Sequence, residues 1–369
     1  MNITCVIHSL HGGGAERVMA GLASRLADRG HQVSLLTFQD GDDQYPVADA
    51  VQRLRLPQAT GSSLPVLGRI QALRRRWRAL GQQIVASRPD VVLSFCDRNN
   101  VDVLIALSEK GRQRTKVPVV VCERSDPSQQ SAGRWRQIAR RRLYPKAATV
   151  VALTKTAASY LSTFSGNVVV IPSAVDSPLV LSNRDQAGQQ RSIVAAGRLE
   201  PEKGFDRLIR AFALGLGSNQ DWKLIIYGQG SQMDTLRELA KQFSVDKRVT
   251  FPGWVSPLAP ALAEATIFCL SSRYEGFPSV VMEAMSMGVP TISVDCESGP
   301  REIITQGVDG WLVEPTEAAL AAGLKHLVAD KPLRESLGQQ GRKIAERLGW
   351  SAMVDQYESM LKTCSHDSA

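Results

Sequence analysis

Two glutamates in the second half of the chain stand in a segment whose residue types and spacing suit the binding of an anion. Glu275 and Glu283 lie eight residues apart on either side of Pro278, and a proline at this place is typical of the first turn of a helix. The free amides of a helix start attract negative charge, so each carboxylate could bind hydroxyls of a sugar that flanks a phosphate held there. A capped helix with a solvent-facing Glu would leave the flanking Gly276-Phe277-Pro278 and Gly288-Val289-Pro290 unexplained.

Two cations follow the first apolar run of the same half of the chain. That run, Ser192–Ala196, leads into Gly197-Arg198-Leu199-Glu200-Pro201-Glu202-Lys203-Gly204. Arg198 offers planar, bidentate donors and Lys203 a point charge, a combination that suits a diphosphate. The next apolar run ends at Gly228, where a glycine leaves room for a ligand against the backbone.

A third glycine-rich loop, His11-Gly12-Gly13-Gly14, follows the first apolar run of the chain and leads into a helical pattern. Its glycines let the backbone approach an anionic or bulky ligand closely. A dinucleotide-binding loop needs G-x-G-x-x-G, and the third glycine is missing here. The oxyanion loop of lipases needs a G-x-S-x-G elbow, which neither residues 61–65 nor residues 349–353 complete. The loop therefore disfavours a nicotinamide oxidoreductase and excludes a hydrolase.

Each of these loops follows a short β-branched run, and each run is followed by a longer amphipathic stretch. This rhythm predicts parallel strands joined by crossover helices. In the first half the expected strands are 3–8, 33–38, 91–95, 117–122, 150–153 and 168–171, with helices at 15–29 and 67–86 among the connections. In the second half they are 192–196, 223–227, 249–251, 267–270, 291–294 and 310–313, with a helix at 205–216.

The chain is therefore expected to be an α/β protein of two tandem, doubly wound Rossmann-like domains that face a cleft. A length of 369 residues agrees, since it exceeds what one hydrophobic core usually absorbs. Ligands of such open sheets bind at the carboxyl ends of the strands. Two helices are expected within 332–362, packed on the outside. The expected division is an N-terminal domain at 1–176, a polar linker at 177–191, a C-terminal domain at 192–349, and a terminal helix with a polar tail at 350–369.

The composition is that of a soluble globular chain, with 43% hydrophobic and 22% charged residues and no apolar run near the ~20 residues that span a bilayer. The N-terminus carries no basic leader, so we expect a cytoplasmic protein. The six cysteines are scattered singly without a C-x-x-C pair, which favours buried thiols over a zinc site or a disulfide framework.

The net charge of +8 is unevenly divided, because residues 1–176 hold 24 Lys and Arg against 13 Asp and Glu, while the rest of the chain is slightly acidic. Arginines interleaved with Trp and Leu at helical spacing suit an anionic membrane surface, and a solvated helix face is the alternative. Nucleic acid is not expected as a partner, since no binding motif accompanies these residues. The basic residues form two clusters, one of Arg69, Arg74, Arg75, Arg76 and Arg78 and one of Arg134, Arg136, Arg140, Arg141, Arg142 and Lys146.

Together these motifs resemble those of the retaining glycosyltransferases of family 4, which have the GT-B fold, and the resemblance spans essentially the whole chain. It implies that Arg198 and Lys203 hold the diphosphate of a nucleotide sugar. It also implies that Glu283 binds the ribose and that Glu275 binds the donor sugar. The motifs that carry it are Gly197-Arg198-Leu199, Lys203-Gly204, the pair Glu275 and Glu283, Gly288-Val289-Pro290 and Gly307-Val308-Asp309-Gly310-Trp311-Leu312-Val313.

The same resemblance assigns further residues to the donor. Trp254, at the end of the segment 251–254, would border the base, while Gly13 and Gly14 would close over the donor from the first domain. The expected donor-binding residues are Gly13, Gly14, Gly228, Trp254, Gly276, Phe277, Pro278, Ser279 and Glu283, beside a catalytic set of Arg198, Lys203, Glu275 and Glu123.

One segment departs from the family pattern. Many members place a histidine after the fifth strand, where this chain has Cys122-Glu123-Arg124-Ser125-Asp126-Pro127. This segment and Ser298-Gly299-Pro300-Arg301-Glu302 look like a bacterial subgroup that adds hexoses or N-acetylhexosamines to lipid-linked or surface oligosaccharides. Glu123 could then orient a hydroxyl of the sugar or acceptor, or it could belong only to an internal Glu-Arg ion pair, and both interpretations stay open.

The expected reaction moves a sugar from its nucleoside diphosphate, with uridine as the commoner base, to an acceptor hydroxyl. No cofactor beyond the donor and no metal is expected, since no D-x-D pair stands in a plausible loop. A sugar-nucleotide epimerase or a phosphorylase of the same architecture is one alternative. A non-catalytic nucleotide-sugar-binding protein is another, which the presence of both carboxylates and both cations disfavours. Through its basic clusters the protein would work at the cytoplasmic face of the inner membrane.

Overall fold

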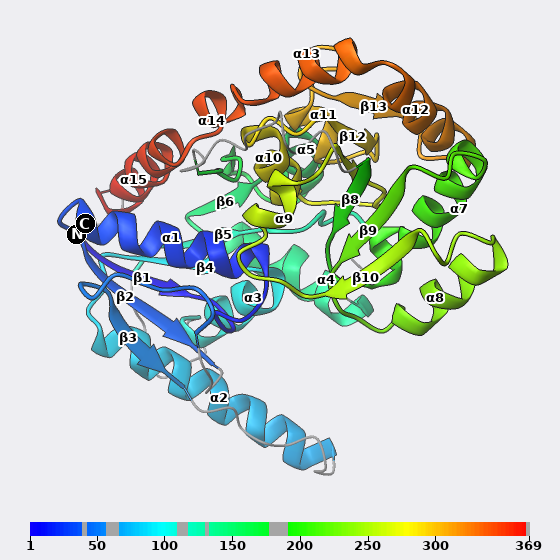
Figure 1. Cartoon of the computed structure of the whole chain (residues 1–369). Coiled ribbons are helices and arrows are strands. Elements are labelled where there is room, and N and C mark those ends of the chain that lie inside the picture. The colour runs from blue at the N-terminus through cyan, green and yellow to red at the C-terminus, as the bar shows by residue number, and fades with distance from the viewer. Residues whose placement is uncertain (39–42, 57–65, 109–116, 130–132, 177–190, 367–369) are drawn as a thin grey trace. The chain divides into compact units, whose positions relative to one another are not determined.

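The computed structural model describes residues 1–38, 43–56, 66–108, 117–129, 133–176 and 191–366. The chain forms two compact units, one of Met1–Ser173 with Ser351–Ala369 and the other of Ala174–Trp350. Each unit contains one sheet of strands with helices packed around it (Figure 1). The expected architecture of two doubly wound α/β domains is thus confirmed. The linker predicted at 177–191 lies, except for Arg191, outside the described residues.

The sheet of the first unit has the strand order β3-β2-β1-β4-β5-β6-β7, and its neighbouring strands all run parallel. Its central strands are buried apolar runs, as in sheets that helices cover on both faces. The sequence does not predict β3 (Gln52–Arg55), because its alternating polar residues suit an edge strand and leave no apolar run to recognise. The other strands are β1 (Asn2–Val6), β2 (Gln32–Thr37), β4 (Val91–Phe95), β5 (Val119–Cys122), β6 (Thr149–Ala152) and β7 (Val168–Val170).

The sheet of the second unit has the strand order β10-β9-β8-β11-β12-β13, again with parallel neighbours. The chain leaves β8 toward β9 on one side and later returns to pair β11 on the other side. That reversal is the topological switch point, where open α/β sheets bind their ligands. The strands are β8 (Ser192–Ala196), β9 (Lys223–Tyr227), β10 (Val249–Gly253), β11 (Ile267–Leu270), β12 (Thr291–Val294) and β13 (Trp311–Val313).

The helices of the first unit cover both faces of its sheet. Connections between parallel strands are right-handed, so α1, which joins β1 to β2, lies on the opposite face from α2, α3 and α4, whose strands follow in the other direction. The helix α2 packs on α3, and α3 packs on α4, so the three form one layer. The helices are α1 (Gly14–Asp28), α2 (Val66–Ala86), α3 (Asp97–Ala106), α4 (Gly133–Leu143) and α5 (Lys155–Ser162), with the short turn η1 (Tyr144–Lys146) after α4.

The end of the chain contains more helices than the sequence pattern suggests. Two helices are predicted within 332–362, whereas the structure has α13, the short α14 and α15 there, because Gly341 ends α13 and Gly349 precedes α15. Among the described residues, no helix has both the length and the apolar character needed to cross a membrane. The helices of the second unit are α7 (Phe205–Leu216), α8 (Met233–Gln242), α9 (Ala259–Ala263), α10 (Ser279–Ser286), α11 (Pro300–Ile303), α12 (Glu317–Ala329), α13 (Lys331–Gly341) and α14 (Ile344–Arg347).

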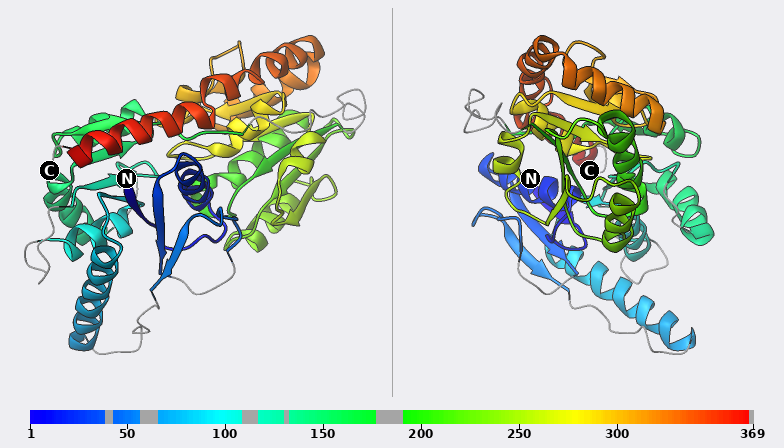
Figure 2. Two further views of the ribbon diagram at one scale, coloured as in Figure 1. Left: turned by 90° about the vertical axis from the view of Figure 1, so that its left-hand side faces the viewer. Right: turned by 45° about the vertical axis from the view of Figure 1, so that its right-hand side comes forward.

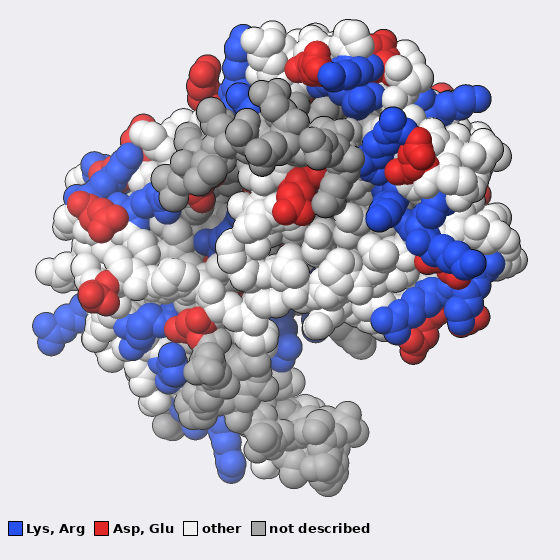
Figure 3. All heavy atoms as spheres, viewed as in Figure 1, with Lys and Arg blue, Asp and Glu red and all other residues white. Residues whose placement is uncertain are grey.

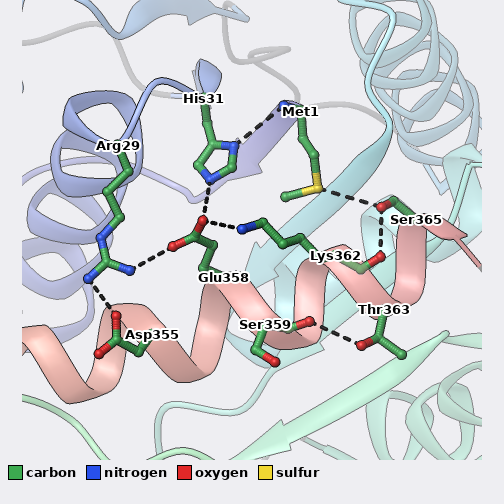
Figure 4. A network of polar contacts seen from close by, with 9 residues as sticks. All are labelled: Met1, Arg29, His31, Asp355, Glu358, Ser359, Lys362, Thr363 and Ser365. Carbon is green, nitrogen blue, oxygen red and sulfur yellow. Dashed lines mark hydrogen bonds and ion pairs between the residues drawn. The ribbon is translucent and has the colours of Figure 1, made fainter.

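The last helix, α15 (Trp350–His366), packs on the first unit. A carboxylate oxygen of Glu358 accepts a hydrogen bond from Arg29 at 2.6 Å, and the other lies 3.2 Å from Nε2 of His31 (Figure 4). Arg29 also forms an ion pair with Asp355 at 2.6 Å. These contacts join the end of the chain to the segment between α1 and β2, so the terminal helix is part of the first domain in space.

Candidate functional site

An ion pair lies at the switch point of the second sheet. The Nζ atom of Lys203, on the loop after β8, is 2.7 Å from Oε1 of Glu275, on the loop after the neighbouring strand β11. Oγ of Ser272 donates to the same carboxylate oxygen at 2.6 Å. Glu275 is only 8% exposed, whereas Lys203 is partly exposed. The pair is therefore sheltered on the side of the glutamate and accessible on the side of the lysine.

Contacts between the two loops fix the position of Lys203. Gly204 has a left-handed conformation (φ +62°), and a Cβ atom there would overlap the carbonyl oxygen of Ser271, so the approach requires glycine. The hydroxyl of Ser271 in turn donates to the carbonyl oxygen of Lys203 at 3.0 Å. The short turn η2 (Pro201–Lys203) is thus held against the end of β11, which sets the distance between Lys203 and Glu275.

A second ion pair supports this turn. Arg273 donates to both carboxylate oxygens of Asp206, at 2.9 and 2.7 Å, and its Nη1 atom also donates to the carbonyl oxygen of Pro201 at 2.6 Å. Hydrogen bonding to Asp206 raises the pKa of Arg273. Burial alone would raise the pKa of Asp206, but the hydrogen bonds and charge of Arg273 lower it. Both side chains therefore stay charged and join the start of α7 to the loop after β11.

The helix α10 begins directly after the Glu275 loop, at the position that the sequence predicts. Its N-cap residue, Pro278, has no side-chain oxygen that could cap the first amides, and because α10 follows β11 its amino end lies at the carboxyl edge of the sheet. Glu283 stands in the second turn and is half-buried. A Cβ atom on Gly299 would lie 2.9 Å from Cδ of Pro278, so the loop after β12 packs closely on the helix start.

The structure gives the two predicted cations different surroundings. Lys203 is held against Glu275, whereas the side chain of Arg198 is 70% exposed and pairs with Glu202 at 2.9 Å. Arg198 is thus at the rim of the site, where its long side chain can turn toward a ligand.

Two residues beside Glu275 belong to the site although the sequence motifs do not include them. Ser272 is buried and supplies the hydrogen bond to the carboxylate. Burial and the nearby charge of Glu202 raise the pKa of the Tyr274 phenol, so the group stays neutral and can donate a hydrogen bond. The signal that could have found Ser272 is the polar pair Ser271-Ser272 directly after a buried apolar strand, since such a pair must face the carboxyl edge of the sheet.

The loops after β8 and β9 touch through two glycines. Gly228 has a φ of +143°, and a Cβ atom there would overlap the carbonyl oxygen of Gly197. The amide of Gly228 donates to the carbonyl oxygen of Gly253 at 2.8 Å. Gly228 is therefore required by the packing of the loops themselves. Trp254, which follows Gly253 at the end of β10, is 45% exposed and so available to a ligand.

Two predicted donor residues, Gly13 and Gly14, belong to the first unit. Gly13 precedes α1 and Gly14 is its first residue, and Gly13, as the N-cap residue, has no side chain with which to cap the helix. A Cβ atom on Gly13 would overlap the carboxylate of Glu16 in the first turn, so this carboxylate lies close to the helix start. The glycine loop thus leads from β1 directly into the first turn of α1.

Glu123, after β5 in the first unit, lies in a buried network and is 1% exposed. Its Oε1 atom accepts a hydrogen bond from the hydroxyl of Tyr144 at 2.5 Å and lies 3.5 Å from Nη1 of Arg140. Burial raises the pKa of Glu123 to about 7, although the charge of Arg140 opposes the shift. The ion-pair partner is Arg140 of α4, while the neighbouring Arg124 donates to Ser173 at 2.6 Å. These are the contacts of an internal ion pair.

The described residues of the second unit thus gather a lysine, two carboxylates and a helix start at one edge of a sheet. A cation and free amides can hold a diphosphate, and carboxylates beside them can bind hydroxyl groups. This set suits a ligand with a diphosphate between two sugars.

Two family models match the chain. The model described as "Glycosyl transferase 4-like domain" matches residues 13–174, and the model described as "Glycosyl transferases group 1" matches residues 182–344. Between them they account for most of both units.

Curated relatives align along nearly the whole chain. "Amylovoran biosynthesis glycosyltransferase AmsD" of Erwinia amylovora is 28% identical over 364 residues, 95% of this chain and 96% of its own length. The "GalNAc-alpha-(1->4)-GalNAc-alpha-(1->3)-diNAcBac-PP-undecaprenol alpha-1,4-N-acetyl-D-galactosaminyltransferase" of Campylobacter jejuni is 27% identical over 339 residues, 91% of each chain.

Solved structures share the fold at low sequence identity. Sucrose-phosphate synthase from Thermosynechococcus elongatus has a TM-score of 0.83 at 20% identity and covers 98% of both chains. HepE of Anabaena in complex with UDP and glucose has a TM-score of 0.79 at 19% identity and covers 98% of this chain and 99% of its own. The two-sheet architecture is therefore the GT-B fold.

Proposed function

The chain belongs to the group 1 glycosyltransferases and has the GT-B fold, and from this premise we propose a specific transfer reaction. A hexose or an N-acetylhexosamine leaves a uridine diphosphate carrier and joins a hydroxyl group of an oligosaccharide acceptor. The anomeric carbon keeps its configuration. The observation that carries the proposal is the ion pair of Lys203 and Glu275 beside the start of α10, at the switch point of the second sheet.

Fixed positive groups stabilise the departing diphosphate. Its negative charge grows as the bond to the sugar breaks, and Lys203 and the first amides of α10 are already in place to balance that charge. Arg198 exchanges its exposed partner Glu202 for a phosphate oxygen. These groups supply the positive charge for which other transferases use a metal ion, so the reaction proceeds without one.

The carboxylates bind the two sugars of the donor. When the diphosphate attracts Lys203, Glu275 keeps its hydrogen bond from Ser272 and accepts a hydroxyl of the transferred sugar in place of the lysine. Glu283, farther along α10, accepts the hydroxyls of the ribose. Trp254, exposed at the end of β10, lies against the base.

Retention of configuration follows when the acceptor attacks from the face that the phosphate leaves. The bond between the anomeric carbon and the phosphate oxygen breaks, the acceptor oxygen forms its bond on the same side, and the acceptor proton moves to the departing phosphate oxygen. No enzymic nucleophile takes part in this route. Glu123, which is buried against Arg140, then serves the structure of the acceptor-side unit.

The acceptor is a lipid-linked or surface oligosaccharide. The names of two relatives, one acting on an undecaprenol-linked glycan and one in amylovoran biosynthesis, support this class. Apart from Gly13 and Gly14, the donor residues belong to the second unit, so most of the first unit is left to bind the acceptor. The arginine clusters of α2 and α4 support work at the cytoplasmic face of the inner membrane.

Lys203→Ala tests the site. It should abolish sugar transfer and the binding of UDP together, because the diphosphate loses its central cation, while circular dichroism still shows a folded protein. Lys241→Ala is the matched control, since it removes a lysine that pairs with Glu238 on α8. Mass analysis of products formed from a nucleotide-sugar panel and a lipid-linked acceptor measures transfer, and calorimetry measures binding. Unchanged turnover in Lys203→Ala would refute the assignment.

A donor-only incubation separates this function from that of an epimerase of the same architecture. A transferase leaves the nucleotide sugar unchanged in its stereochemistry when no acceptor is present, apart from slow hydrolysis. An epimerase converts it, and the altered sugar is seen after chromatography.

A further inference from the structure

The helices α2 and α4 carry ten arginines and no carboxylate. Each helix contributes five, and neither sequence contains Asp or Glu. A solvated helix face usually mixes the two signs, as α8 does with its ion pairs Arg237–Asp234 and Lys241–Glu238. Figure 3 shows blue and red side by side over the region of α8, and basic side chains at the lower edge of the first unit, where α2 lies in Figure 1.

The acids of α3, between these two helices, do not balance this charge at the surface. Asp102 is buried and pairs with Arg76 at 2.8 Å, and Asp97 is buried within 3.9 Å of Arg136. Arg140 is likewise taken into the network of Glu123. The arginines that remain exposed on the described surface of α2 and α4 are Arg74, Arg75, Arg78, Arg136, Arg141 and Arg142.

Exposed apolar side chains accompany these arginines. Within the described residues of the first unit, all the exposed large hydrophobic side chains lie on α2 and α4. They are Ile70 and Leu73, at 44% and 43% exposure, and Trp135 and Ile138, at 84% and 42%. Their confinement to the two arginine-rich helices sets this surface apart from the rest of the unit.

The apolar stripe of α2 continues past the core that it helps to form. Leu80 and Ile84 are fully buried, whereas Ile70 and Leu73, on the same stripe about two to four turns earlier, are not covered. A helix of 21 residues is about 31 Å long, while the five residues of β4 span about 17 Å. Figures 1 and 2 show the first part of α2 standing clear of the sheet.

The exposed apolar residues of both helices lie at the same edge of the first sheet. Both helices connect parallel strands, so both begin at the carboxyl edge and run back to the amino edge. Ile70 and Leu73 are in the first half of α2, and Trp135 and Ile138 are in the first half of α4. The loops after β4 and β5, which in open α/β sheets face the ligand, end at this edge as well.

We propose that this surface docks the first unit on an anionic lipid membrane. Below it is called the docking face: Ile70, Leu73, Arg74 and Arg78 of α2 with Trp135, Ile138, Arg141 and Arg142 of α4. The apolar side chains enter the headgroup region, where tryptophan is favoured, and the arginines bind lipid phosphates. The inference rests on the proposed function in one respect only, that the membrane presents a lipid-linked acceptor to the carboxyl edge of the first sheet.

Flotation of the full chain with lipid vesicles tests the docking face. The wild type should float with vesicles that contain phosphatidylglycerol and remain unbound with vesicles of phosphatidylcholine alone, and high salt should release it. An arginine near an anionic surface contributes about fivefold to binding, so Arg141→Gln with Arg142→Gln should weaken flotation about 25-fold. Arg237→Gln with Lys241→Gln on α8 is the control of equal charge and should float like the wild type.

The apolar half of the docking face has its own measurement. Trp135→Phe should lose most of the fluorescence quenching that brominated lipids cause in the wild type, because Trp135 is the indole that enters the membrane. Trp135→Ala with Ile138→Ala should lower flotation while the thermal unfolding temperature stays unchanged, since both side chains are exposed.

Three results would overturn the proposal: no flotation of the wild type, equal flotation on both kinds of vesicle, or equal loss in the α4 and α8 variants. Binding of UDP by the α4 variants should stay at the wild-type level, because their substitutions lie on the first unit. A wild type that floats but transfers no sugar would refute the proposed function and leave the docking proposal intact. A wild type that transfers sugar to a soluble acceptor but does not float would refute the docking proposal and leave the proposed function intact.

Discussion

Replacing Glu123 by Gln should remove a pH dependence from the stability of the first unit. Burial raises the pKa of Glu123 from its ordinary 4.5 to about 7. Between these two values the folded protein keeps a proton that the unfolded chain has released. The free energy of unfolding should therefore be highest below the unfolded pKa, fall as the pH rises toward the folded pKa, and level off above it.

The size of the effect follows from the shift. A rise of the pKa from 4.5 to about 7 corresponds to about 3 kcal/mol, most of which is lost between about pH 5 and about pH 8. Glutamine can still accept the hydrogen bond from Tyr144, but it leaves the buried charge of Arg140 without a counter-charge. The variant should therefore be less stable by a few kcal/mol where Glu123 is ionised. The diagnostic quantity is how the difference between wild type and variant changes with pH.

Denaturant unfolding at a series of pH values gives this quantity. Hydrogen exchange of peptides from β5 and α4 measures the stability of the first unit separately from that of the second. Glu358→Gln is the control of opposite sign, because hydrogen bonds from Lys362 and Arg29 lower the pKa of Glu358 to about 2. Its contribution is present above the unfolded pKa and is lost as the pH falls toward 2. A difference between wild type and Glu123→Gln that stays flat from about pH 5 to about pH 8 would show that Arg140 keeps Glu123 ionised and would refute the reasoning.

Glu275→Gln should reduce kcat far more than it weakens the binding of UDP if its carboxylate binds the transferred sugar as proposed; equal losses in kinetics and calorimetry would remove it from that position. Sugar transfer should proceed at the same rate in excess EDTA as with Mg²⁺ if Lys203 and the α10 amides supply the positive charge as proposed, and an inactive chelated enzyme would reveal a metal site. Gly228→Ala should lower the stability of the second unit by about 2 kcal/mol or more, because its φ is +143° and a Cβ atom would overlap the carbonyl oxygen of Gly197. Gly166→Ala, where a Cβ atom meets nothing within 4 Å, is the neutral comparison in thermal unfolding.

The strands that carry the donor site are predictable from the sequence because of their burial. A strand covered by helices on both faces is a short continuous apolar run, and β8, β9, β11 and β12 have the predicted bounds. The loops that follow them are then predictable as ligand loops, and so is the start of α10 after Pro278. The edge strand β3 cannot be predicted in this way, because it has an exposed side and contains no apolar run.

The ion pair of Lys203 with Glu275 cannot be predicted from any local sequence pattern. The two residues are 72 positions apart and meet because β11 pairs with β8, a strand order that depends on how all the helices pack. The partner of Glu123 illustrates the same limit. The adjacent Arg124 is the natural choice from the sequence, yet burial brings Arg140 from the next helix and turns Arg124 toward Ser173.

The position of the terminal helix depends on contacts between the two ends of the chain. Its sequence predicts an amphipathic helix but does not indicate which part of the protein covers the apolar side. Tyr357 is fully buried 6.2 Å from the ring of Phe95, and Glu358 reaches Arg29 across 329 positions. Interactions at such separations follow from the completed fold, so the prediction of an external helix at 350–369 could not state which domain it joins.

The charge of the first half of the chain is a local property of two helices. Residues 1–176 hold 24 basic and 13 acidic residues, and ten of the basic ones are the arginines of α2 and α4. Without these two helices the first half would be close to neutral. Charge that served only solubility would be spread over the surface with both signs interspersed. Pairing inside the fold accounts for Arg76 and Arg140, whereas other arginines of these helices are exposed beside apolar side chains, and this combination is the basis of the proposed docking on a lipid surface.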